Sequence, residues 1–363
     1  MAPINPTPAP AAPFDIVQTY HHLLTSDPDL TMPVAAIESL IQLLQHSHST
    51  TVFETLDLLA AQSSLLQSRV RNPIALSAGT DLFQRYMISS LRASGERSFD
   101  AVRAHLLANG RVFVSRAKAA RERIAGHAGG LVRDGCTVLT QGGSRVVSAV
   151  LARAAGAGRG GGTVRFKVIY VDSGNGAGAG ESRDIVRKLR AKGVPVAVIG
   201  EGAVGYAMGM VDLVIVGAEG VVENGGVISR MGTYQIGVLA RAAGKPFYVV
   251  AETHKFVRLY PLGQYDLPIV QRVVEFTTGT GKEGEKKGEG EERAVEGEAP
   301  SQKSSVDTEG WKDYFTTEEG EERQREREDA VDYTPPDLVS ALITENGVLT
   351  PSAVSEELIS VFV

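Results

Sequence analysis

From residue 137 onward, short apolar runs alternate with segments of helical periodicity, and this alternation restricts the fold more than any other feature of the sequence. The apolar runs occupy residues 137–140, 164–171, 194–199, 213–216, 247–250 and 339–344. The helical segments lie at 144–155, 182–191, 204–210, 234–243 and 352–361. Uniformly apolar strands separated by amphipathic helices predict a parallel sheet covered by helices on both faces. Such sheets bind ligands at the carboxyl ends of their strands.

The first third of the chain follows the helical period instead. Val34, Ile37, Leu40, Ile41 and Leu44 recur at the spacing of one buried helix face. Further helices are indicated by Phe53, Leu56, Leu59 and Leu66, by Leu82, Phe83, Tyr86, Met87 and Leu91, and by an arginine-rich stretch at 112–124. We therefore predict a helical domain over residues 14–130, followed by a Rossmann-like α/β domain with a parallel sheet over residues 131–363.

Two segments lack the composition of a packed core. Residues 1–13 hold five of the sixteen prolines and no basic residue. Residues 282–329 carry 9 basic against 17 acidic residues, which is more net negative charge than the −6 of the whole chain. The acidic segment is poor in aliphatic residues and rich in Glu, Gly and Lys, so it cannot offset the entropy cost of ordering. We predict a disordered N-terminus and a disordered acidic insertion in the α/β domain.

Composition excludes several classes of function. The net charge of −6 argues against a nucleic-acid partner. The single cysteine, Cys136, rules out a disulfide framework and a multi-cysteine metal site, and it opens an apolar strand as an inert buried thiol would. The N-terminus lacks the charged start of a targeting peptide, and no apolar stretch reaches the ~18 residues of a membrane span. We expect a cytoplasmic protein of the cytosol with no membrane partner.

A first glycine loop lies directly between a strand and a helix. Gly142, Gly143, Ser144 and Arg145 stand at the start of that helix, where free N–H groups and an arginine bind anions. A tight turn with Ser144 as the helix cap explains the same residues. Both interpretations are open from the sequence.

A second candidate site is the loop 217–233, which places Glu219, Asn224 and Arg230 among five glycines beyond a strand end. We predict that these polar groups recognise hydroxyls and phosphate; the alternative is a solvated loop with glycines for its turns.

The remaining motifs give no firm prediction of a cofactor or metal site. Residues 174–179 match G-x-G-x-x-A, and Glu201 follows the next strand as a ribose-binding acid would. The match falls in an internal βα unit of low complexity, so we predict no nicotinamide cofactor. The histidines of the helical domain lack metal-ligand spacing, and no metal is predicted. His254 and Lys255 follow a strand end and are placed to reach the ligand crevice.

Four longer stretches carry specific motifs. They read VLTQGGSRVVSAVL (138–151), LVIVGAEGVVENGGVISRMGT (213–233), KPFYVVAETHKFVRLYPL (245–262) and DYTPPDLVSALITENGVLTPSAVSEELI (332–359). These stretches resemble the family of alpha subunits of eukaryotic translation initiation factor 2B. The resemblance covers the chain from about residue 130 to its end, apart from the acidic insertion, and the helical part fits more loosely.

The resemblance implies a regulatory, non-enzymatic subunit of the guanine-nucleotide exchange factor that recharges initiation factor 2 with GTP. It also implies partners: a homodimer made by the α/β domain, and the beta, gamma, delta and epsilon subunits of the same exchange factor. The helical domain is expected to help sense the phosphorylated alpha subunit of initiation factor 2, which inhibits exchange.

The same fold is shared with methylthioribose-1-phosphate isomerase and ribose-1,5-bisphosphate isomerase, which provide the alternative function. Against those enzymes, Gly142 stands at the position of the cysteine, Glu219 at that of the aspartate, and Ser229 and Arg230 at that of an Asn-Lys dyad. An acid without its thiol partner leaves the proton-transfer pair incomplete. We therefore expect a vestigial phosphosugar pocket that binds without isomerising. Its expected residues are Gly142, Gly143, Ser144, Arg145, Glu219, Asn224 and Arg230.

Overall fold

The computed structural model describes residues 14–27, 30–47, 49–70, 73–93, 99–156, 165–172, 179–271, 273–274 and 330–362. The predictions for residues 1–13, for 282–329 and for the glycine run at 174–178 lie outside the described residues.

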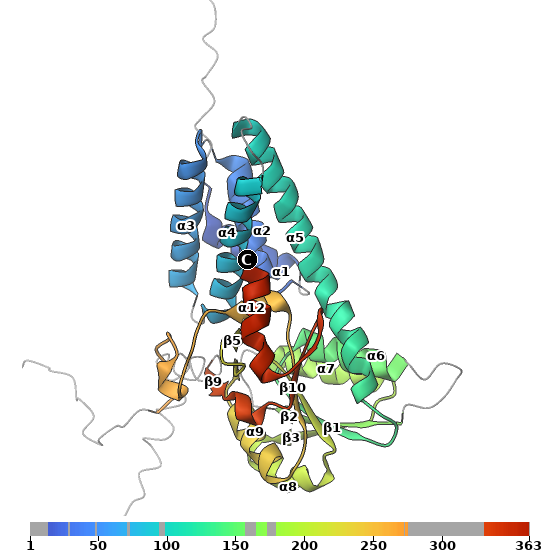
Figure 1. Cartoon of the computed structure of the whole chain (residues 1–363). Coiled ribbons are helices and arrows are strands. Elements are labelled where there is room, and N and C mark those ends of the chain that lie inside the picture. The colour runs from blue at the N-terminus through green and yellow to red at the C-terminus, as the bar shows by residue number, and fades with distance from the viewer. Residues whose placement is uncertain are drawn as a thin grey trace, which may run out of the picture.

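Helices make up the first part of the chain and stand on one end of the α/β part (Figure 1). They are α1 (Ile16–Ser26), α2 (Met32–His46), α3 (Val52–Arg69), α4 (Ile74–Ala93) and α5 (Phe99–Ala128). Helix α2 contacts all four others, and its predicted face from Val34 to Leu44 is buried. The long α5 continues down to the sheet and packs against α6 (Arg145–Gly156).

The buried face of α3 matches the predicted one only in part. Phe53 is 76% exposed, whereas Thr55, Leu59, Ser63 and Leu66 face the core. A buried threonine costs little when it is hydrogen-bonded, and the Thr55 hydroxyl bonds the backbone of its own helix and the Ser49 hydroxyl at 2.9 Å. The apolar pattern therefore identified Leu59 and Leu66 correctly, but it placed Phe53 in the core and missed the small polar residues Thr55 and Ser63.

A seven-stranded sheet forms the centre of the second part. Its strands are β1 (Thr137–Gln141), β2 (Lys167–Asp172), β3 (Val196–Gly200), β4 (Leu213–Gly217), β7 (Phe247–Val250), β10 (Ala341–Thr344) and β11 (Gly347–Leu349). The order is β11-β10-β7-β4-β1-β2-β3, and every pairing is parallel except that of β11 with β10. This confirms the predicted α/β fold class, in which the chain winds outward from β1 in both directions.

Consecutive strand residues point to opposite faces, and helices cover both. Val138 and Ile215 pack in a core with α6 and α7 (Ala179–Ala191), while Leu139 and Val214 pack with α8 (Val204–Ala207), α9 (Thr233–Ala242) and α12 (Val354–Phe362). Burial on both faces explains why these strands read as continuous apolar runs. The edge strand β3 is less covered, and Val198 is exposed.

A second sheet replaces part of the predicted loop 217–233. It contains β5 (Gly220–Val222), β6 (Val227–Arg230), β8 (Phe256–Val257) and β9 (Val331–Thr334) in the order β8-β5-β6-β9. The prediction of a loop was therefore wrong, because strands of two to four residues are too short to show a period. Ile74 and Ala78 of α4 pack against this small sheet, so it lies between the helices and the main sheet.

No helix in the described part of the chain is long and apolar enough to cross a membrane.

Candidate functional site

The topology creates a crevice between β1 and β4. The chain leaves β1 toward β2 on one side and leaves β4 toward β7 on the other, so the loops at their carboxyl ends diverge. A cavity of about 210 Å³ opens at this point. Six of the seven predicted site residues line it: Gly142, Gly143, Ser144, Arg145, Glu219 and Arg230.

The loop after β1 is a tight turn that is fixed by hydrogen bonds. Gly142 has a φ of +74°, which favours glycine, and the phenol of the buried Tyr170 on β2 donates to its carbonyl. The Ser144 hydroxyl accepts a hydrogen bond from the N–H of Val147 at 3.3 Å, so Ser144 caps α6. The cap interpretation is therefore confirmed. It also fixes the helix N-terminus at the cavity wall.

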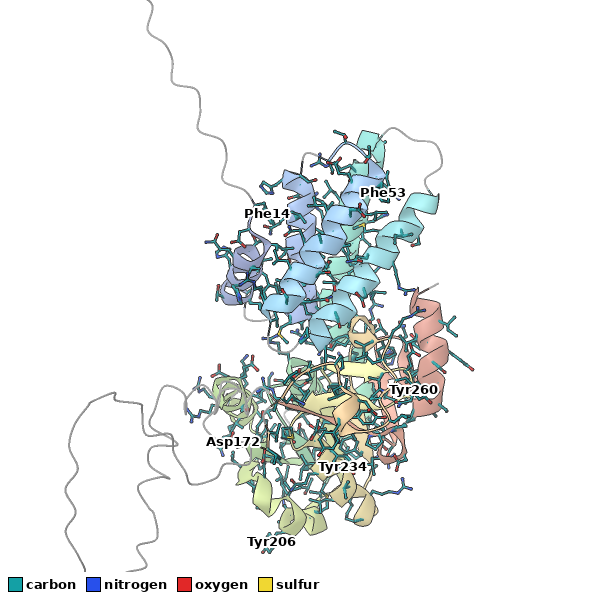
Figure 2. The ribbon with its side chains drawn as sticks, turned by 90° about the vertical axis from the view of Figure 1, so that its left-hand side faces the viewer. Phe14, Phe53, Asp172, Tyr206, Tyr234 and Tyr260 are labelled. Atoms are coloured by element: carbon teal, nitrogen blue, oxygen red, sulfur yellow. The ribbon has the colours of Figure 1, made fainter. Side chains whose placement is uncertain are left out.

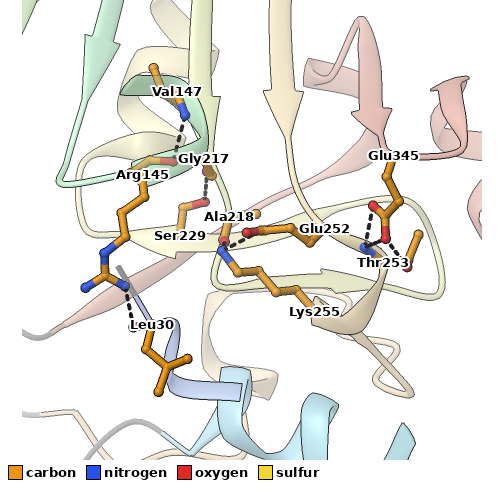
Figure 3. Close-up of polar contacts among 11 residues, drawn as sticks. Leu30, Arg145, Val147, Gly217, Ala218, Ser229, Glu252, Thr253, Lys255 and Glu345 are labelled. Atoms are coloured by element: carbon orange, nitrogen blue, oxygen red, sulfur yellow. Dashed lines mark hydrogen bonds and ion pairs between the residues drawn. The ribbon is translucent and has the colours of Figure 1, made fainter. Parts of the chain in front are cut away.

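Two arginines in the cavity share one carboxylate that the sequence analysis missed. Glu181, in the first turn of α7, lies 3.4 Å from the Arg145 guanidinium and 3.5 Å from that of Arg230. Its carboxylate oxygen is so close to Gly143 that a Cβ there would lie 2.3 Å from it. Arg145 also donates to the carbonyl of Leu30 at 2.9 Å, which ties the cavity to the helical part (Figure 3). Glu181 therefore lies beside the turn where a phosphate is expected.

A buried ion pair forms the back wall. Lys255 Nζ lies 3.0 Å from a carboxylate oxygen of Glu252 and donates to the carbonyl of Ala218 at 3.0 Å (Figure 3). Glu252 is only 1% exposed. Burial alone would raise the pKa of Glu252, but its neighbours, Lys255 foremost, and its hydrogen bonds together outweigh burial and lower that pKa to about 2. Lys255 thus reaches the crevice as predicted.

The charges around the cavity balance. Its lining holds three cationic side chains (Arg145, Arg230 and Lys255) and three acidic ones (Glu181, Glu219 and Glu252). A phosphate would therefore meet no net positive charge unless a carboxylate moved away.

Asn224 lies outside this cavity, which corrects its prediction as a ligand-binding residue. Its side chain closes the β5–β6 turn by accepting from Gly226 N–H and donating to the Pro261 carbonyl and the Tyr333 hydroxyl. An asparagine beside two glycines is typical of such a turn. The sequence analysis missed this interpretation because it had no hairpin there.

Two other residues considered in the sequence analysis, His254 and Cys136, also lie outside this cavity. His254 does not line this cavity, although its neighbours Glu252 and Lys255 do. Cys136 is buried before β1, where burial raises the pKa of its thiol. The only cysteine of the sequence is therefore outside the crevice. Within the described ranges, no three His, Cys, Asp or Glu side chains gather closely enough to hold a metal ion.

Comparisons with known proteins support the resemblance. The chain is 31% identical to the translation initiation factor eIF2B subunit alpha of Dictyostelium discoideum over 96% of each chain. It is 33% identical to a ribose 1,5-bisphosphate isomerase of Archaeoglobus fulgidus, but over only 46% of this chain and 50% of the enzyme. The solved eIF2B beta2-delta2 complex of Chaetomium thermophilum matches with a TM-score of 0.65 at 19% identity over 95% of this chain and 94% of the matched chain, which shows the shared fold. The initiation factor 2 subunit family model matches residues 25–351, and the chain therefore belongs to the initiation factor 2 subunit family.

Proposed function

We propose that this protein is a regulatory, non-enzymatic subunit of the guanine-nucleotide exchange factor that acts on translation initiation factor 2. The similarity to an alpha subunit along almost the whole chain, helical part included, carries the proposal. The similarity to isomerases covers less of the chain: 46% of it for the ribose 1,5-bisphosphate isomerase and 73%, at 27% identity, for a methylthioribose-1-phosphate isomerase of Oleidesulfovibrio alaskensis. We place the protein in the cytosol, where this factor would act.

Purification of the tagged chain from its own cells tests the assignment. We expect the beta, gamma, delta and epsilon subunits to copurify, and initiation factor 2 to be recovered more weakly. Addition of the chain to an exchange complex lacking it should change nucleotide release only when the alpha subunit of initiation factor 2 is phosphorylated. Copurification of none of these subunits would contradict the proposal.

An aldose-phosphate isomerase is the second candidate, because the cavity retains an acid, Glu219, at the end of β4. The cavity offers no thiol: Gly142 has a backbone that favours glycine, and Cys136 lies elsewhere. We expect no turnover of methylthioribose-1-phosphate or ribose-1,5-bisphosphate. Measurable isomerisation that is lost in Glu219→Gln would establish the enzyme instead.

The same cavity is proposed to bind a sugar phosphate as a ligand. The N-terminus of α6, Arg145 and Arg230 would hold the phosphate, and Glu219 would accept from sugar hydroxyls. A ligand at 100 times its Kd should stabilise the fold by about 2.7 kcal/mol. The Arg230→Glu variant should lose this thermal shift. Arg165→Glu is the control, because Arg165 is an exposed residue before β2, and it should keep the shift.

A homodimer made by the α/β domain is proposed from its exposed apolar side chains. Tyr206 of α8 is 87% exposed and Met210 is 59% exposed, and Val198 of the edge strand β3 is also exposed. Figure 2 shows Tyr206 at the end of the molecule opposite the helices, clear of any contact with them. Exposed apolar side chains after β3 and on this edge strand itself suit contact with a second copy.

Sedimentation of the purified chain tests the dimer. We expect a dimer at micromolar concentration and a folded monomer for the double variant Tyr206→Glu, Met210→Glu. A wild-type monomer would contradict the proposal. So would a variant that still forms the dimer.

The helical domain is proposed to contribute to sensing the phosphorylated alpha subunit of initiation factor 2. We expect the exchange complex to bind the phosphorylated form more tightly than the unphosphorylated form. Removal of this subunit should abolish the difference.

A further inference from the structure

A second cavity lies between the helices and the α/β part, away from the sugar-phosphate site. It has a volume of about 600 Å³, within the range of small-ligand sites. One face of α4 (Leu82, Arg85, Tyr86 and Ser89) and one face of the arginine-rich part of α5 form two walls. The turn after β7 and the turn between β10 and β11 form the others. The functions proposed above make no use of it.

The turn from Glu252 to Lys255 separates the two cavities. Glu252 and Lys255 line the first cavity, whereas Thr253 and His254 line the second. Figure 3 shows this division, with Lys255 reaching Ala218 on one side and Thr253 bound to Glu345 on the other. Glu345 accepts from the Thr253 N–H at 3.1 Å and from its hydroxyl at 2.6 Å. That carboxylate is therefore occupied in fixing the turn.

The chemistry of the second cavity is donor-rich and aromatic. Arg85, Arg116 and Arg123 bring three guanidinium groups against the single carboxylate of Glu345. Tyr86 and Phe113 add two rings whose centroids lie 5.9 Å apart. Because guanidinium groups pair best with phosphate or carboxylate oxygens, the lining favours an anion with a flat organic part.

His254 supplies an independent sign of a ligand. It is 3% exposed, and its Nε2 has no hydrogen-bond partner among the described residues. Buried polar atoms are nearly always paired. Burial also lowers the pKa of His254 to about 4, so the ring is neutral at pH 7 and can donate one hydrogen bond to a ligand atom.

We infer that this second cavity binds a phosphate monoester of a small, flat organic molecule. Arg116 and Arg123 of α5 hold the phosphate, His254 Nε2 donates to it, and the organic group packs on Tyr86 and Phe113. The inference concerns a site other than the sugar-phosphate pocket and does not depend on that pocket's function.

Titration with phenyl phosphate tests the site in the full-length protein, with phenol and inorganic phosphate as the partial probes. We expect phenyl phosphate to bind more tightly than either partial probe and to shift the ring signals of His254, which are assigned from their loss in His254→Gln. The double variant Arg116→Gln, Arg123→Gln should weaken binding at least tenfold, because it removes two charged hydrogen bonds to the phosphate. Both arginines are exposed, so the variant should fold.

Two controls separate this site from the first cavity. Arg111→Gln removes an exposed arginine from the same helix that does not line the cavity, and it should leave the affinity unchanged. Arg230→Glu, in the first cavity, should also leave it unchanged. Absence of binding, absence of a His254 shift, or equal weakening by Arg111→Gln would overturn the inference.

Discussion

The carboxylate of Glu181 should act as an internal competitor for phosphate in the first cavity. It pairs with Arg145 and Arg230 at 3.4 and 3.5 Å, the two groups proposed to hold a phosphate there. A phosphate that takes both guanidinium groups must break both pairs. We therefore expect Glu181→Gln to bind sugar phosphates more tightly than the wild type.

The exposure of the paired side chains limits how far the Kd for sugar phosphates can fall in Glu181→Gln. The Glu181 side chain is 45% exposed and the two arginines are about one third exposed, so each pair contributes at most about 1 kcal/mol. Breaking both costs the ligand up to about 2 kcal/mol, which corresponds to up to about 30-fold in Kd. The fold itself should lose no more than about 2 kcal/mol of stability, by the same limit for the two partly exposed pairs.

Calorimetric titration with ribose 1,5-bisphosphate measures the effect. Asp184→Asn is the matched control, because Asp184 lies on the same helix and pairs with Arg187 at 2.8 Å outside the cavity. We expect a five- to 30-fold lower Kd for Glu181→Gln and no change for Asp184→Asn. An equal or higher Kd for Glu181→Gln would refute the reasoning and would assign Glu181 a direct role in holding the ligand.

Two further predictions concern buried charges. Lys255→Met should lower the free energy of unfolding by about 3–5 kcal/mol, because it leaves Glu252 charged and buried without a partner. Denaturant titrations measure this loss. The double variant Lys255→Met, Glu252→Gln should recover most of it. Asp332 caps α9 through the N–H groups of Gly232 and Tyr234, and burial raises its pKa from 3.8 to about 7. The folded state therefore binds the extra proton between those values, so this group's contribution to stability falls as pH rises from 4 to 7. The stability difference between wild type and Asp332→Asn, measured at several pH values, should show that fall, and a difference independent of pH would contradict it.

The main sheet could be predicted because its strands are buried on both faces. The apolar run that forms β4 contains no polar residue. The alternation of such runs with helices indicates parallel pairing. The position of the ligand crevice follows from the same argument, since the loops after β1 and β4 meet at the point where the winding reverses. Five of the predicted residues reached the cavity for this reason, whereas Arg230 reached it from the end of β6 in the second sheet.

What could not be predicted depends on contacts between distant segments. The β5–β6 hairpin is stabilised by pairing with β9, about 100 residues later, and its short strands show no period of their own. Glu181 comes from a helix whose position relative to β1 is fixed only in the folded chain. Asn224 was misplaced because a polar residue after a strand end looks the same in a ligand loop and in a tight turn.

The proposed sugar-phosphate site would separate ligand binding from catalysis. Phosphate binding would depend on the backbone at the start of α6, which is held by the Ser144 cap and by Tyr170 on the neighbouring strand. Proton transfer of the kind expected from the resemblance to the isomerases would need a thiol and an acid, and Gly142 stands at the expected position of the thiol. A change at that position removes the acid–base pair but leaves the helix terminus and the arginines in place. Binding and chemistry thus rest on different parts of the same crevice, so a thermal shift without turnover is the outcome that this geometry favours.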